Sequence, residues 1–305
     1  MQNKSLGLIM MMIGLSALIY TARGQGCSDA GFCTLGNFKP NGLDSTSGFK
    51  NELKLGLSFG RADHSITIFG THLDYQRMLN KKLSFSARLT SLSQSGNGIS
   101  AFGFSDLFLS ADYPAGTIGK ITLGFKLPLN DASKIKKNLP LPMDYQSSLG
   151  TLDLLLGISR VWNKFHLALA LQQPLAQNQN EFAAEDYPAG SALKKFQTTN
   201  RFRRRGDLMA RVSYSIPLNN QFKITPGLLP VIHLGKDQYT DREGLERAID
   251  GSQGLTLNGT VHFDYEINNN HSLQLNAGVP FIVRKERPDG LTRSFIATLE
   301  YRRTF

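Results

Sequence analysis

The segment 294–305 limits what this chain can fold into, because its residues alternate between two kinds of side chain. Every second residue belongs to a face that is apolar apart from one arginine: Phe295, Ala297, Leu299, Tyr301, Arg303 and Phe305. The residues between them are polar: Thr298, Glu300, Arg302 and Thr304. Successive side chains of a β-strand point to opposite faces of its sheet. The pattern predicts a strand with hydrocarbon on one side and water on the other.

Similar alternation recurs from Asn51 onward, at intervals of roughly a dozen residues. This spacing is too short for crossover helices and fits an antiparallel meander. About twelve strands are expected, at 53–59, 66–77, 83–89, 104–113, 121–127, 152–158, 165–171, 208–216, 222–234, 255–265, 273–281 and 294–305. The fold class is therefore all-β, and the sequence predicts a transmembrane antiparallel up-and-down β-barrel over residues 49–305.

The connections between these strands alternate in length. Short turns are expected at 80–81, 113–119, 163–164, 219–220 and 268–270, and longer loops at 93–101, 130–150, 172–205, 235–253 and 284–292. Aromatic residues gather at the short-turn ends of the strands, as in an interfacial girdle: Tyr75, Phe85, Tyr113, Trp162, Phe165, Tyr214, Phe222, Tyr265 and Tyr301. Barrels of the bacterial outer membrane have short periplasmic turns and long external loops. The sequence predicts that location, in a Gram-negative bacterium.

The polar face of the strands predicts a hydrated lumen, because so many ionisable groups would be costly in a dry core. The expected pore-lining residues are Arg88, Asp106, Lys126, Asp153, Asp207, Arg211, His262 and Asp264. Three of them, Asp106, Asp153 and Asp207, could form an acidic ring opposing Lys126 and Arg211. The alternative is that they pair with these bases and stiffen the wall.

The first 24 residues have the features of a signal peptide. Lys4 precedes the apolar run 6–20, and Ala22 and Gly24 supply small residues at a plausible cleavage site before Gln25. This run is shorter than the ~20 residues that a membrane-spanning helix needs. We therefore expect residues 1–24 to be removed on export.

Residues 25–48 precede the barrel and lack strand alternation. They contain Cys27 and Cys33, and an oxidising periplasm favours a disulfide between them. The apolar Phe32, Leu35 and Phe38 suggest a plug in the periplasmic mouth of the barrel. A frayed tail is the competing interpretation.

The formal net charge of +10 bears on the partners of the chain. A basic chain can bind nucleic acid, but an exported chain does not meet it, and no recognition helix or zinc pattern is present. The expected partners are outer-membrane lipid and lipopolysaccharide, a small-molecule solute and the barrel assembly machinery, which is thought to read a terminal aromatic such as Phe305. No cofactor and no metal are expected.

Four stretches carry a resemblance to a known family. They are Gly103 to Leu107, Lys126 to Ser133, Leu149 to Asp153 with Gly157, and Arg205 to Leu208. These stretches resemble the transporter-like outer-membrane barrels of the MetA-pathway phenol-degradation family. The resemblance implies passive uptake of small molecules, including hydrophobic or aromatic compounds.

Two other function classes remain open. One is a barrel enzyme that acts on lipids through a Ser/His/Asn constellation, and the other is a surface adhesion or secretion-assembly component that uses the long loops. His72, His166 and His262 would point inward, but none lies in the sequence context of that lipase family. We therefore expect a channel without catalytic residues.

Overall fold

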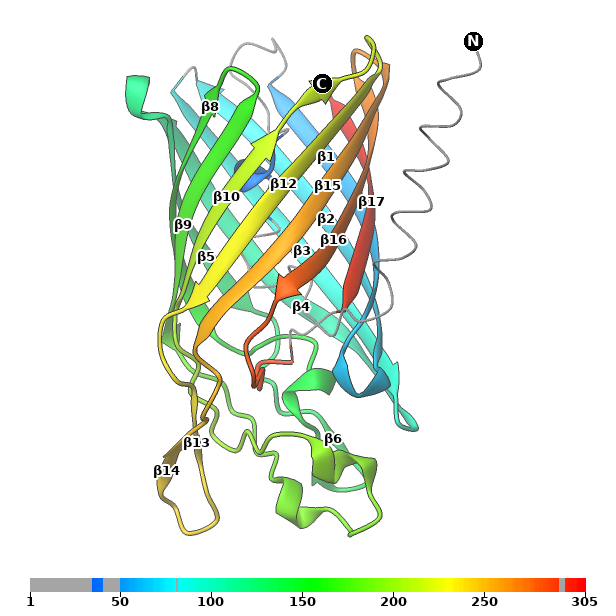
Figure 1. The fold of residues 1–305 in the computed structure, drawn as a ribbon, viewed down its shortest axis with the longest axis vertical. Helices are drawn as coiled ribbons and strands as arrows, with labels where there is room; N and C mark the ends of the chain where they lie inside the picture. The colour runs from blue at the N-terminus through cyan, green and yellow to red at the C-terminus, as the bar shows by residue number, and fades with distance from the viewer. Residues whose placement is uncertain (1–34, 41–49, 81, 291–293) are drawn as a thin grey trace.

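The computed structural model describes residues 35–40, 50–80, 82–290 and 294–305. Twelve long strands form one closed antiparallel barrel (Figure 1). They are β1 Asn51–Arg61, β2 Thr67–Asn80, β3 Leu83–Gly96, β4 Ile99–Pro114, β5 Lys120–Pro128, β8 Leu152–Trp162, β9 Phe165–Ala176, β10 Asp207–Tyr214, β12 Phe222–His233, β15 Gly254–Asn268, β16 His271–Ile282 and β17 Phe295–Thr304. β1 pairs with β17 and completes the ring. The predicted fold class and strand order are confirmed.

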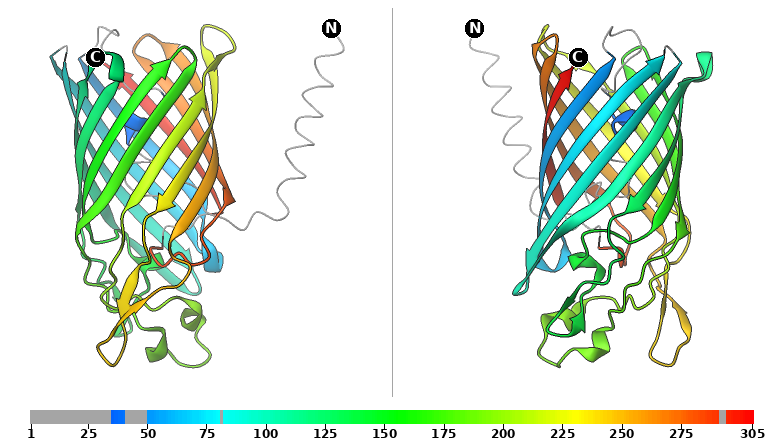
Figure 2. Two further views of the ribbon diagram at one scale, coloured as in Figure 1. Left: turned by 60° about the vertical axis from the view of Figure 1, so that its left-hand side comes forward. Right: turned by 180° about the vertical axis from the view of Figure 1, so that it is seen from behind.

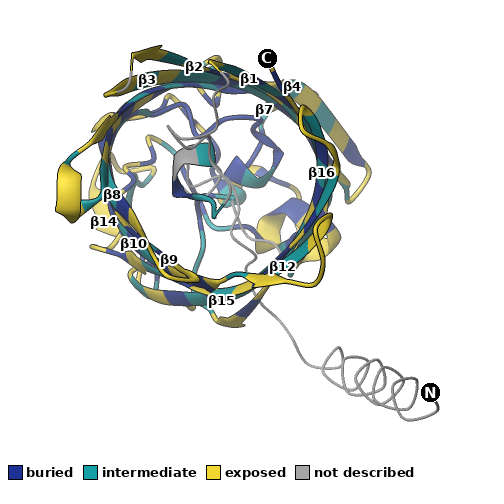
Figure 3. Ribbon diagram, turned by 90° about the horizontal axis from the view of Figure 1, so that it is seen from above, coloured by how far each residue is buried: buried dark blue, intermediate teal, exposed yellow. Residues whose placement is uncertain are grey.

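The two faces of the strands differ in the way that the alternation predicts. Leu55 and Leu57 of β1 are 51% and 53% exposed on the outside of the ring. Lys54, the residue before Leu55, is only 5% exposed on the inside. In β17, Leu299 is 50% exposed and Glu300 only 3%. In the view along the barrel, the strands of the ring carry buried segments next to exposed ones (Figure 3). Apolar side chains thus cover the exterior and ionisable groups line the interior.

The two ends of the barrel differ in their connections. Short turns lie at one end, at the top of Figure 1 with the C-terminus, and the long connections lie at the other (Figure 1). We call these the short-turn end and the long-loop end. Exposed aromatic residues cluster at the short-turn end, where Phe165 lies edge-on to Tyr214 at 4.9 Å between ring centroids and Phe222 stacks on Tyr265 at 4.6 Å.

One expected loop is wrong. Residues 93–101 belong to β3 and β4, which continue as a hairpin beyond the neighbouring strands. Asn97 and Gly98 make the turn, with φ of 51° and 71°. An Asn-Gly pair with both residues at positive φ closes a two-residue hairpin in the sense that matches strand twist. That dipeptide was the sequence signal for a hairpin rather than a loop.

The long connections fold into a structure of their own, visible below the barrel (Figure 2). We call residues 129–151, 177–206, 234–253 and 283–290 the loop lid. Its elements are short: β6 Ile135–Lys136, β7 Leu139–Pro140, η6 Met143–Tyr145, η7 Ala184–Asp186, η8 Ala192–Lys195, β13 Gln238–Thr240 and β14 Glu246–Ala248. Seen along the barrel, β7 lies within the outline of the ring (Figure 3).

Two apolar clusters hold the loop lid together. Tyr145, Phe182 and Phe196 pack with Ile66 and Ile68 at the rim of the barrel. Ala132, Met143, Leu149, Phe202 and Ile249 form the second cluster. Loops that bury their own apolar side chains keep a defined shape. The long-loop end is therefore covered by ordered structure.

A short segment that precedes β1 lies inside the ring. It contains η3 Gly36–Phe38, the blue turn within the barrel in Figure 1. The predicted signal peptide and both cysteines, Cys27 and Cys33, lie outside the described residues, so their disulfide stays a prediction, as do the boundaries at 24 and 48. Within the part of the chain that the structure describes, we find no helix with the length and apolarity to span a membrane.

Candidate functional site in the barrel lumen

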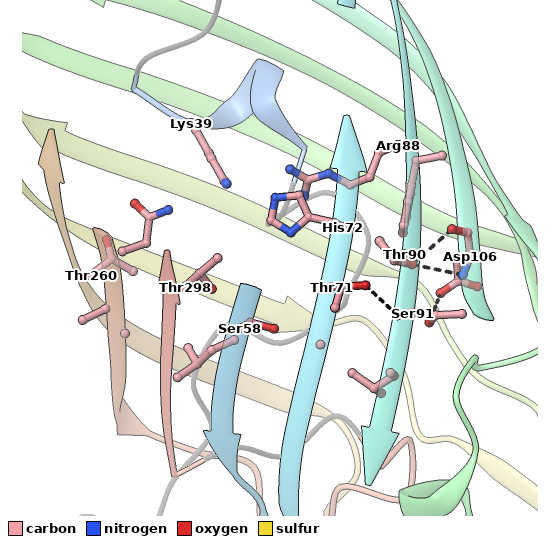
Figure 4. Close-up of a pocket in the computed structure, with 18 of the residues that line it drawn as sticks. Lys39, Ser58, Thr71, His72, Arg88, Thr90, Ser91, Asp106, Thr260 and Thr298 are labelled. Carbon is pink, nitrogen blue, oxygen red and sulfur yellow. Dashed lines mark hydrogen bonds between the residues drawn. The ribbon is translucent and has the colours of Figure 1, made fainter. Parts of the chain in front are cut away.

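A cavity of about 110 Å³ lies in the middle of the lumen (Figure 4). We call it the lumen chamber. Its lining combines hydroxyl and amide side chains, charged side chains and apolar groups: Lys39, Ser58, Gly70, Thr71, His72, Arg88, Thr90, Ser91, Leu92, Ser105, Asp106, Phe108, Arg211, Thr260, His262, Asn276, Ala277, Gly278, Ile296 and Thr298. Hydroxyls of neighbouring strands bond to each other across this wall, as Thr71 and Ser91 do at 2.7 Å.

Charged groups line the side of the lumen chamber that faces the short-turn end, and we call this group the floor. Glu300 of β17 lies between Lys39 Nζ, at 3.0 Å from its Oε2, and His72 Nε2, at 2.9 Å. Arg88 binds Asp74 through two nitrogens and lies 3.9 Å from Glu300. Side chains from β2, β3, β17 and the N-terminal segment thus converge on one carboxylate. The bidentate pairing of Arg88 with Asp74 fixes both side chains in place.

This floor also contains a group of possible metal ligands. His72, Asp74 and Glu300 offer ligand atoms that lie within 4.8 Å of one another. Lys39 and Arg88 already neutralise the two carboxylates. A cation could bind there only after displacing these two side chains, so the arrangement is that of an ion-pair network.

The N-terminal segment contacts the lumen wall through apolar side chains. Leu35 and Phe38 are buried against inward-facing residues of β4, β8, β9, β10 and β12: Phe108, Leu155, Ala168, Ala170, Met209 and Leu229. A Cβ added at Gly157 would lie 2.4 Å from Phe38 Cζ, so only glycine leaves room for the ring. The wall therefore has a hollow that holds one phenyl ring.

Asp153 and Lys126 form a fully buried pair beside the lumen chamber. Lys126 Nζ lies 2.9 Å from Asp153 Oδ2 and donates to Thr151 Oγ1 at 2.8 Å, and Gln172 donates to the same carboxylate. Both side chains are completely shielded from solvent. Of the two interpretations drawn from sequence, this pair agrees with the structural one.

The loop lid bounds the lumen chamber on the side of the long-loop end. Asp106 Oδ1 accepts a hydrogen bond from Ser148 Oγ at 2.6 Å, and Gln94 donates to the carbonyl of Gln146 at 2.6 Å. Residues 143 and 146–149 line a narrow space together with Asp289 and Gly290, between the loop lid and Asp106. We call this the outer constriction. In this conformation the chamber is narrowed at both ends.

Burial in the loop lid raises the pKa of Asp144 to about 7. The nearby carboxylates Asp63 and Asp289 raise it further, while a backbone hydrogen bond and Arg287 oppose the change. Asp144 is half-buried and belongs to η6, next to the outer constriction. The lid therefore contains a carboxyl group that ionises near neutral pH.

The eight residues predicted to line a pore all lie on the inward face, at different depths. Arg88, Asp106, Arg211 and His262 line the lumen chamber. Arg211 Nη1 lies 3.4 Å from His262 Nε2. Asp264 lies nearer the short-turn end, 3.9 Å from Lys223. Asp207 lies at the long-loop end, paired with Arg204 rather than Arg211. Asp153 pairs with Lys126 and Asp207 with Arg204, and an acidic ring of the three aspartates stays a prediction.

Sequence reasoning missed several residues of the site. Asp74 follows His72 by two positions and therefore shares its face, so alternation was enough to find it. Lys39 could not be found in this way, because its partner Glu300 is 261 residues away in the sequence.

Comparison with known proteins bears on the fold. No protein-family model and no curated protein matches the chain. Among solved structures, it is similar to the COG4313 outer membrane channel from Pseudomonas putida F1, with 16% sequence identity, a TM-score of 0.57, and coverage of 89% of this chain and 99% of that one. The NanC porin matches at 9% identity and a TM-score of 0.46, over 83% of this chain and 98% of the other. The first likeness confirms the fold of an outer-membrane barrel. Membership of the phenol-degradation family stays a prediction.

Proposed function

We propose that this protein is a channel of the bacterial outer membrane for passive entry of small molecules. One observation carries the proposal: an apolar exterior encloses a polar, charged lumen that contains a chamber between two constrictions. A buried row of charged side chains has no role in a stable dry core, and it suits a hydrated path. The short-turn end then faces the periplasm and the loop lid faces the outside.

The size of the chamber limits the solute. An apolar cavity of roughly 150 Å³ accommodates benzene. The lumen chamber, at about 110 Å³, holds at most a molecule of about that size in the present conformation. Leu92, Phe108 and Ile296 supply apolar surface, and the serine and threonine hydroxyls supply hydrogen bonds. Small aromatic or other partly hydrophobic compounds fit this lining.

The N-terminal segment acts as a plug in this proposal. Phe38 fills the hollow in the wall and Lys39 reaches Glu300. The segment is therefore held by one apolar contact and one ion pair. Removing residues 27–45 should raise the permeability of the barrel. Loss of the folded barrel in the truncated protein would show instead that the segment is needed for structure.

The test is flux through liposomes that contain the purified protein. Chloride salts, sugars and phenol-sized aromatics are compared, with protein-free liposomes as the control. We expect slow flux of the smallest solutes and faster flux in the protein that lacks residues 27–45. Release of fatty acid from the lipid without any flux would contradict the channel and favour the enzyme. In the enzyme a histidine would activate a serine, whereas His72 here contacts Glu300.

A further inference from the structure

Six charged side chains form a buried cluster where the loop lid meets the barrel. They are Arg204, Asp207, His233, Asp237, Arg284 and Asp289, and we call them the rim cluster. None is more than 7% exposed. Asp207 begins β10 and His233 ends β12, where the two residues are cross-strand neighbours. The other four come from three different segments of the lid.

His233 lies between two carboxylates. Its Nδ1 is 2.7 Å from Asp207 Oδ1, and its Nε2 is 2.8 Å from Asp237 Oδ1. Asp207 also accepts from Arg204, and Asp237 Oδ1 accepts from the backbone N–H of Arg205 at 2.9 Å. An ionised carboxylate only accepts hydrogen bonds, and a neutral imidazole has only one N–H. Both ring nitrogens can therefore donate only if His233 is an imidazolium.

The charges of the cluster agree with that state. Three carboxylates face two guanidinium groups: Arg284 Nη2 lies 3.0 Å and Arg204 Nε 3.8 Å from Asp289 Oδ2, and Arg284 Nη1 lies 4.0 Å from Asp237 Oδ2. Protonated His233 makes three positive charges against three negative ones. Asp153 of β8 adds a negative field at Arg204 from the lumen side. Loss of the proton would leave a buried excess of negative charge.

The rim cluster is joined to the outer constriction. Asp289 belongs to both, because it lines the narrow space above Asp106. Arg284 also donates to the carbonyl of Ser252 at 2.6 Å, and Ser252 Oγ accepts from the backbone N–H of Asp237 at 2.8 Å. Movement of the segment 284–290 would therefore change the width of the constriction and the packing of residues 237–252 together.

We propose that His233, protonated between Asp207 and Asp237, is a latch that keeps the loop lid closed over the lumen, and that its deprotonation releases residues 284–290 and widens the outer constriction. The gating part of this inference rests on the proposed channel function. A group that is protonated in the closed state contributes stability below the pH at which it titrates and loses it as pH rises. The lid should be closed at acidic and neutral pH and loosen under alkaline conditions.

Hydrogen exchange on the full-length protein in detergent measures the latch without any need for flux. The amides of Glu286 and Ile249 donate to the carbonyls of Gly251 and Asp237 and report on the two lid segments. Between about pH 6 and pH 10 we expect their protection factors to fall by about tenfold or more. Conductance in planar bilayers, measured over the same range, should rise in parallel.

Two substitutions have opposite expected effects. His233→Gln removes the positive charge, so the lid should be loose and the conductance high at every pH. Asp237→Asn removes one negative charge, so neutral His233 no longer leaves an excess, and the lid should stay protected at high pH. His271→Gln, at the opposite end of the barrel beside Tyr301, is the matched control and should behave like the wild type.

Asp144 is a second titratable group of the lid, with a pKa raised to about 7, so Asp144→Asn separates its effect from that of His233. The fall in protection at alkaline pH must persist in Asp144→Asn and vanish in His233→Gln. Protection factors that do not change with pH in the wild type would overturn the latch, and falling protection with constant conductance would overturn its gating role. If neither the wild type nor the protein without residues 27–45 conducts, the proposed channel function fails, while the exchange data still decide whether the latch exists.

Discussion

Replacing Phe38 tests whether the N-terminal segment obstructs the lumen. The ring is fully buried among Leu155, Ala168 and Ala170, so Phe38→Ala loses the burial of a whole aromatic side chain. Such a change costs about 3 kcal/mol or more, which shifts the balance between docked and undocked segment roughly 100-fold. Conductance in planar bilayers should increase toward that of the protein without residues 27–45.

The same result should follow from a change in the wall. Gly157→Ala places a methyl group where the ring of Phe38 lies, at 2.4 Å from Cζ, and leaves the segment itself unchanged. Phe85→Ala is the matched control, because Phe85 is 42% exposed on the outside of the barrel. Heat-dependent migration on gels shows whether each variant still forms a barrel. Wild-type conductance in both Phe38→Ala and Gly157→Ala, together with a higher value after deletion of 27–45, would refute the ring as the anchor.

Three further changes test other parts of the structure. Asp153→Asn leaves Lys126 buried without its carboxylate, so the free energy of unfolding measured in urea should fall by about 3 kcal/mol. An unchanged free energy of unfolding would contradict the buried pair. Glu300→Gln removes the ionic anchor of Lys39, so conductance should rise, although less than in Phe38→Ala; a decrease would argue against the plug. The pKa of Asp144 is raised to about 7, so the folded lid binds a proton that an unfolded aspartate, with a pKa of about 4, has released, and the lid loses stability as pH rises to 7. Asp144→Asn should therefore make the lid more resistant to proteolysis at pH 7 and above and leave it almost unchanged at about pH 4, whereas equal effects at both values would contradict this reasoning.

Alternation was sufficient to predict the barrel wall, because the side-chain period of a strand is independent of distant contacts. It located the outward Leu154 and Leu156 of β8 and the inward Asp153. It also contained the signal for the hollow that holds Phe38, since Leu155 and Met209 are apolar residues on the polar face. Apolar side chains on the wet side of a barrel indicate that something apolar covers them.

The loop lid and the rim cluster could not be predicted in this way. Arg284 and Asp289 come from segments without periodicity. Their contacts, like that of His233 at the end of β12 with Asp237, depend on how separate loops fold onto one another. Asp207 was expected on the inward face, but its partners are set by the lid. Polar residues in irregular segments have no sequence period that reveals their neighbours.

The pairing of β1 with β17 has a consequence for how the barrel is made. Asn51 and Phe305 exchange backbone hydrogen bonds across 254 residues of sequence. The other strands meet partners that are close in the chain, but β1 must wait until β17 has been synthesised. Until then the growing sheet has two open edges, and each unpaired peptide group costs several kcal/mol in hydrocarbon. The nascent sheet therefore needs a temporary partner for its edges or must stay out of the lipid. Substitutions along this seam should slow biogenesis more than they weaken the completed ring.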